Sequence, residues 1–134
     1  MAQVTRKGLH FHSTVNSDSD EKDSYNVRHD ATIEHVEVRF YPGQQLDLEV
    51  ELHVVDENGT SKEIVDPVGE KPYLAGDDDF FKFDVSVPIE KDDEIRVVAR
   101  NQDTSGNDYD YIVNMELDRI GGIERVITKL RGVF

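Results

Sequence analysis

Three consecutive acidic residues, Asp77, Asp78 and Asp79, are the strongest candidates in this sequence for binding a ligand. They end a long polar stretch, and Ca²⁺ takes six to eight oxygen ligands, which surface loops often supply. The alternating acids and distant Glu of an EF-hand are missing, however, and more than one residue in five of the chain is acidic. We therefore expect no resident cofactor, with Ca²⁺ bound by these three carboxylates as the alternative.

His10 and His12 are two positions apart, so both side chains project from one face of an expected strand. That spacing can chelate a divalent metal in a cupin-type site. Such a site also needs a Glu a few residues on and a distant His in a Pro-x-Gly-x-x-His context, and the sequence has neither. His35 and His53 alternate with acids, which is typical of the solvated face of a strand.

No motif of a known catalytic class occurs in the chain. The sequence lacks a Gly-x-Ser-x-Gly elbow, a phosphate-binding loop, a dinucleotide fingerprint and a His-Glu-x-x-His helix, and it has no cysteine. We therefore expect no enzymatic activity. Asn58-Gly59-Thr60 matches the N-glycosylation acceptor pattern, but a tight turn explains the Asn-Gly pair equally well.

The chain of 134 residues has a formal charge of −14, and this charge is unevenly distributed. The N-terminal strand or arm, residues 1–16, carries +2, the body 17–118 carries −19, and the tail 119–134 carries +3. We expect all three parts to belong to one domain. The acidic body would repel nucleic acid, so no nucleic-acid partner is expected. The longest apolar runs are only a few residues, which predicts no membrane span.

The C-terminal tail combines basic residues with apolar residues, and it follows a Gly121-Gly122 pair. We expect it to form an interface with other copies of the chain or with other acidic structural proteins, either as a short helix or as a strand. The alternative is that it covers its own domain. The expected interface residues are Arg119, Ile123, Arg125, Val126, Ile127, Lys129, Leu130, Arg131 and Phe134.

Apolar and polar residues alternate along most of the body, which is typical of half-buried antiparallel strands. Ile33 is out of phase with Val36, which predicts a β-bulge near Glu34 and His35. The strands are expected within 9–15, 36–40, 46–54, 62–65, 81–89, 95–99 and 109–117. Seven or eight short strands predict an all-β antiparallel sandwich with jelly-roll wiring, with an immunoglobulin-type sandwich as the alternative.

Turn residues lie between these expected strands. Pro42-Gly43 predicts a short hairpin, and the Asp56 to Gly59 run predicts another. Three longer polar segments are expected to be surface loops: 17–24, 66–79 and 102–108.

The composition adds a resemblance. Asp (17 residues) outnumbers Glu (12) and Lys is scarce (7), which is similar to proteins of extremely halophilic archaea. With the alternating strands from Leu9 to Leu117 and the Asp-rich loops, the chain resembles small β-sandwich and jelly-roll proteins that build the shells, turrets and tail parts of haloarchaeal viruses. The resemblance implies a homo-oligomeric structural protein located in the virion, as capsid, decoration, turret or tail component, and it assigns no site residue.

The alternative function is a carbohydrate- or calcium-binding module of a haloarchaeal surface protein, with the cell surface or the cytoplasm as its location. In that case the loop that contains Asp77 to Asp79 would carry the binding site.

Overall fold

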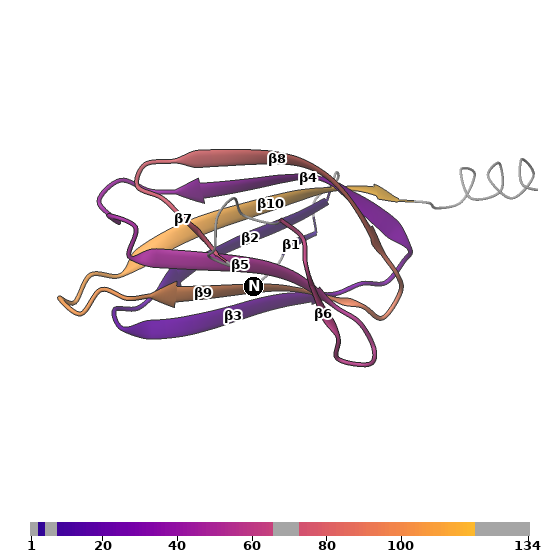
Figure 1. The fold of residues 1–134 in the computed structure, drawn as a ribbon, viewed down its shortest axis with the longest axis horizontal. Coiled ribbons are helices and arrows are strands. Elements are labelled where there is room, and N and C mark those ends of the chain that lie inside the picture. Colours follow the sequence, from indigo (N-terminus) through magenta and orange to yellow (C-terminus); the bar gives the residue numbers. More distant parts are fainter. Residues whose placement is uncertain (1–2, 5–7, 66–72, 120–134) are drawn as a thin grey trace, which may run out of the picture.

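A computed structural model describes residues 3–4, 8–65 and 73–119, which form two packed antiparallel sheets (Figure 1). Sheet A has the strand order β1-β2-β10-β4-β8, and sheet B has the order β3-β9-β5-β6, with β7 also paired to β5. The strands are β1 (Gln3–Val4), β2 (Gly8–Val15), β3 (Ser19–Asn26), β4 (Ala31–Phe40), β5 (Leu48–Val55), β6 (Ser61–Glu63), β7 (Leu74–Ala75), β8 (Phe80–Ile89), β9 (Glu94–Asn101) and β10 (Tyr109–Arg119).

The chain crosses repeatedly from one sheet to the other. Strands β2, β4, β8 and β10 belong to sheet A, and the strands that follow or precede them, β3, β5 and β9, belong to sheet B. Strands far apart in sequence therefore become neighbours, such as β2 with β10 and β4 with β8. This is jelly-roll wiring, and the predicted all-β sandwich is confirmed.

The core lies between the sheets and contains the inward side chains of the alternating strands. Phe11 of β2, Val38 of β4 and Val113 of β10 in sheet A share this core with Val50 of β5 in sheet B, and all four are fully buried. Because each removes its apolar surface from water, the alternating pattern stabilises the two-layer arrangement.

The predicted bulge in β4 is confirmed. The pairing of β4 with β8 shifts between Ile33 and His35, and the pairing with β10 shifts at the same place. In the pairing with β10 the extra residue is Glu34, and in the pairing with β8 the extra residue lies on β8. Ile33 and Val36 both stay buried, while Glu34 and His35 both face outward. The bulge therefore determines the position of His35 on the outer face of sheet A.

The prediction of a surface loop at 17–24 was wrong, because residues 19–26 form β3, an edge strand of sheet B. Its positions opposite the buried side chains of β9 include Glu21 and Asp23, so no apolar alternation marks the strand. Charged residues that point inward on an edge strand discourage pairing with further chains. Because of this polar pattern, the sequence did not indicate a strand at the edge of the sheet.

Two further expectations about the connection between β4 and β5 were wrong. Pro42-Gly43 does not close a hairpin, because β4 and β5 belong to different sheets. Leu46 is not in the strand: its φ is 68°, its side chain is 61% exposed, and β5 begins only at Leu48. The hairpin predicted at residues 56–59 is confirmed, since β5 pairs with β6 across it.

Candidate functional site

The three acids predicted to bind Ca²⁺ have partners within the protein. Asp77 accepts hydrogen bonds through Oδ1 from two backbone N–H groups of the β4–β5 connection, at 2.8 and 3.2 Å. Asp78 forms an ion pair with Arg39 at 2.8 Å, and Asp79 accepts a hydrogen bond from the N–H of Asp77. These contacts hold two connections together. Over the described residues, no group of three metal-ligating side chains is assembled, and Ca²⁺ binding stays a prediction.

The predicted tail interface begins where β10 ends, at Arg119, whose backbone pairs with Ala31 of β4. The other predicted interface residues lie outside the described residues: Ile123, Arg125, Val126, Ile127, Lys129, Leu130, Arg131 and Phe134. In the part of the chain that the structure describes, no helix has the length and apolarity that crossing a membrane requires.

His10 and His12 do lie on one face of β2, with their ring centroids 6.4 Å apart. Each ring has its own partner on the neighbouring strand β10. The Nδ1 atom of His10 hydrogen-bonds the side-chain oxygen of Asn114, and Nε2 of His12 lies 3.6 Å from a carboxylate oxygen of Asp110. The two imidazoles therefore belong to a wider polar surface on sheet A.

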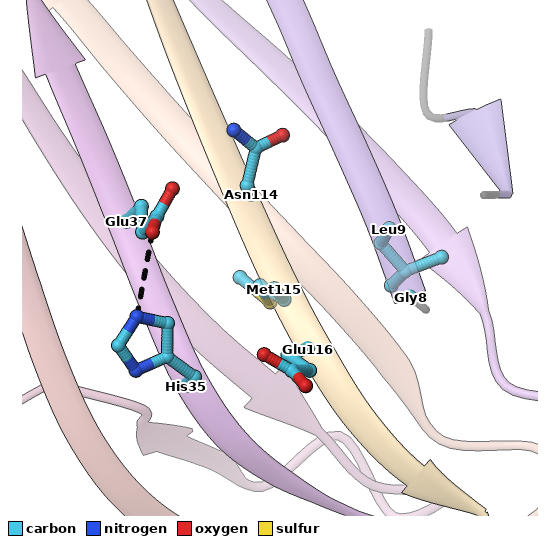
Figure 2. A pocket seen from close by; sticks show the side chains of 7 residues that line it. All are labelled: Gly8, Leu9, His35, Glu37, Asn114, Met115 and Glu116. Carbon is cyan, nitrogen blue, oxygen red and sulfur yellow. Dashed lines mark ion pairs between the residues drawn. The ribbon is translucent and has the colours of Figure 1, made fainter. Parts of the chain in front are cut away.

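We call this surface face A: the outward side chains of β2, β10, β4 and β8. His35 lies near its centre because the bulge directs it outward. Its Nδ1 lies 2.9 Å from Oδ1 of Asp84 on β8, and its Nε2 lies 3.4 Å from Oε1 of Glu37 (Figure 2). The hydrogen bond with Asp84 is the main reason that the pKa of His35 is raised above its ordinary value of 6.5, and Glu37 raises it further.

A cleft of about 190 Å³ opens on face A between β2, β10 and β4. Figure 2 shows the lining side chains of β4 and β10 and, beyond β10, Gly8 at the end of β2. In the β2–β10 ladder Gly8 lies opposite Glu116, so no side chain fills that position. A Cβ atom at Gly8 would collide with the carbonyl oxygen of Met115. The hollow therefore follows from the close approach of the two backbones. The lining residues are Gly8, Leu9, His35, Glu37, Asn114, Met115 and Glu116.

The sequence analysis missed this cleft and interpreted His35 as part of an ordinary solvated strand. The one signal in the sequence was the phase break at Ile33, which predicted the bulge. The cleft itself depends on which residues of β2, β10 and β4 lie side by side, and that register is set by packing of distant segments.

The outward side chains of β3, β9, β5 and β6 form face B, which has different chemistry. Arg96 donates two hydrogen bonds to the carboxylate of Glu94, at 3.0 and 3.1 Å. Arg100 lies 2.7 Å from Oε2 of Glu51. The hydrogen bond from Arg96 lowers the pKa of Glu94. These carboxylates are therefore already paired with permanent cations.

Comparison with known proteins supports the fold and no more. No protein-family model matches the sequence, and no curated protein matches it. Among solved structures, the chain is similar to a mitogen derived from Yersinia pseudotuberculosis, with a TM-score of 0.50 and 10% identity over 80% of this chain and 82% of that chain. This likeness agrees with the two-sheet architecture.

Two other similar structures have TM-scores below 0.5, and they carry no argument about this chain. CBM32-1 of a family 31 glycoside hydrolase from Clostridium perfringens has a TM-score of 0.47 and 17% identity over 82% of this chain and 76% of that chain. A chain of infectious bursal disease virus Gt strain has a TM-score of 0.41 and 12% identity over 91% of this chain and 32% of that chain. The protein is thus an antiparallel β-sandwich of the jelly-roll type.

Proposed function

We propose that the protein is a structural component of a virion that works in concentrated salt, and that it assembles through its basic and apolar C-terminal segment. The observation that carries this proposal is the charge division of the chain. The body 17–118 carries −19, and the segment 119–134, which begins at the last residue of β10, carries +3. Strand β10 lies at the centre of sheet A. Opposite charges on the body and the tail favour contact between copies.

The position of the acids supports the saline setting. Among the described acidic residues, only Glu49 and Asp93 are buried. The remaining carboxylates of the described body face water to at least a partial extent, where they repel one another in dilute buffer. Because the Debye length falls to about 3 Å at 1 M salt, concentrated salt removes most of this repulsion. We expect the melting temperature to rise between about 0.1 and 3 M KCl. An unchanged or falling melting temperature would contradict the saline setting.

Assembly is tested with full-length variants in about 3 M KCl, where apolar contacts dominate over charge contacts. Ile127→Ser with Leu130→Ser removes two apolar side chains of the tail. Leu46→Ser with Phe80→Ser is the matched control, because these two are the most exposed large apolar residues of the described chain. Sedimentation velocity should show an oligomer for the native chain and the control, and a monomer for the tail variant. The proposal is contradicted if the native chain sediments as a monomer or if the tail variant still assembles.

A further inference from the structure

The residues that line the cleft on face A are suited to binding a cation. Two carboxylates line it, those of Glu37 and Glu116, and no Lys or Arg is among its lining residues. Glu37 has His35 as a neighbour at 3.4 Å. Glu116 is exposed, and within the described residues it has no hydrogen-bond or ion-pair partner. On face B, by contrast, the carboxylates of Glu94 and Glu51 have guanidinium groups beside them.

We propose that this cleft receives a basic side chain from residues 120–134 of a second copy of the protein. This inference rests on the assembly function proposed above, and it specifies the surface to which the tail binds. A side chain with a long aliphatic stem and a charged end fits a narrow cleft whose acceptors are carboxylates and an amide, such as Asn114. Among the described residues, His35, Glu37 and Glu116 are not assembled as a group that could hold a metal, which favours an organic cation over a divalent metal ion.

The tail supplies suitable cations. It carries Arg125, Lys129 and Arg131 against a single acid, Glu124. If extended, its 15 residues would span about 50 Å, which is enough to reach across a neighbouring small domain. Apolar residues between the basic ones can bury surface at the same contact.

The direction of β10 favours a second copy over the same chain. This strand passes Asn114 and Glu116, which line the cleft, and then ends at Arg119. The chain therefore leaves the sheet heading away from its own cleft, and it would have to reverse direction to enter it. A segment from a neighbouring copy can approach without this reversal.

The first test is a charge-neutralising pair of substitutions, Glu37→Gln with Glu116→Gln. Glu57→Gln with Glu90→Gln is the matched control, because both residues are exposed and neither lines the cleft. In about 0.5 M KCl, where charge contacts still contribute, the cleft variant should assemble about five- to tenfold more weakly than the native chain. The control should differ from the native chain by less than about twofold.

The second test identifies the occupant on the native sequence. A carbodiimide joins a carboxylate to an amine without a spacer, and Lys129 is the single lysine in residues 120–134. Isotope-labelled and unlabelled copies are mixed, cross-linked and digested for mass spectrometry. A link from Lys129 to Glu37 or Glu116 that joins labelled to unlabelled peptide supports the inference. Links found within one copy alone overturn it, and so does the absence of any link from Lys129 to either residue when the cleft variant also assembles normally.

The outcomes separate the two proposals. If the Ile127→Ser and Leu130→Ser variant fails to assemble while the cleft variant assembles normally, the tail mediates assembly but the cleft is not its receptor. If neither variant affects the oligomer, the assembly function itself is wrong.

Discussion

The two outer faces of the sandwich differ in the cations that their carboxylates meet. On face B, guanidinium groups lie against Glu94 and Glu51 at 3.0 and 2.7 Å. On the central part of face A, an imidazole lies between Asp84 and Glu37. Arginine stays charged at all accessible pH, whereas histidine changes charge near neutral pH. Face B thus has guanidinium groups against Glu94 and Glu51, with the imidazole of His53 3.5 Å from Glu51, whereas Asp84 and Glu37 of face A have an imidazole between them.

Face A and face B also differ in shape. The bulge in β4 turns His35 outward, and Gly8, which begins β2, leaves the position opposite Glu116 without a side chain. Among the described strands, the pairing of β4 with its two neighbours in sheet A is irregular, and this irregularity lies beside Glu116, whose carboxylate has no partner among the described residues. Irregular pairing of this kind often occurs where a sheet binds a partner.

Among the substitutions that test the difference between the two faces, Gly8→Ala should have the largest effect on the free energy of unfolding. Gly8→Ala adds a Cβ that collides with the carbonyl oxygen of Met115, and the obstacle is backbone that cannot rotate away. We expect a loss of about 2–3 kcal/mol in the free energy of unfolding, measured by urea titration. Asn26→Ala, at an exposed position of β3 on sheet B, is the control and should change it by less than about 0.5 kcal/mol. Equal stability of Gly8→Ala and the native chain would mean that glycine is not what opens the cleft.

Much of the fold could be predicted from the sequence, because apolar side chains mark the inner face of most strands. The alternation in 81–89 and 109–117 predicted β8 and β10 nearly to their ends. The edge strand β3 could not be found in this way, since Glu21 and Asp23 occupy its inward positions. Turn residues such as Pro42-Gly43 indicate that the chain changes direction, but they do not reveal whether it returns to the same sheet.

The candidate site could not be predicted from the sequence, and the physical reason is different. Its groups come from strands that are neighbours in space but distant in the chain: Gly8 on β2, His35 on β4 and Glu116 on β10. No local spacing brings them together. The acids that are adjacent in sequence, Asp77 to Asp79, were instead the obvious candidates, and their carboxylates bond to backbone groups and to Arg39.

After Gly8→Ala, the second largest effect on the free energy of unfolding is expected from a substitution on face B. Arg100→Gln removes the cation beside Glu51, whose side chain is only 11% exposed. The remaining partner of Glu51 is His53 at 3.5 Å. We expect a loss of about 1 kcal/mol in the free energy of unfolding.

Lys62→Gln is the control for this variant. It removes the same charge from an exposed residue of β6 in the same sheet, and it should cost at most a few tenths of a kcal/mol. If the two variants have equal stability, the Arg100 to Glu51 pair contributes nothing beyond net charge, and face B is not stabilised by its ion pairs.

His35→Gln should have the smallest effect, and it should be the one that depends on pH. Asp84 on β8, Glu37 on β4 and Glu116 on β10 face His35. Glu34 of β4 and Lys82 of β8, which lies opposite Glu37, are on the same face. The pKa of His35 in the folded protein lies above 6.5, because its charged form gains from Asp84 and Glu37. The imidazolium therefore contributes stability that is complete below about pH 6.5 and is lost as the pH rises through the raised folded-state pKa.

The melting temperatures of the native chain, His35→Gln and Arg100→Gln, measured from about pH 5.5 to 9 at one salt concentration, distinguish the two faces. The difference between the native chain and His35→Gln should be greatest at the acid end and should shrink toward the alkaline end. The difference for Arg100→Gln should vary less over this range, because a guanidinium carries its charge throughout it. A His35→Gln difference that stays level, or that grows with pH, would mean that the imidazole stabilises face A by packing alone. The two faces would then not differ in their response to pH.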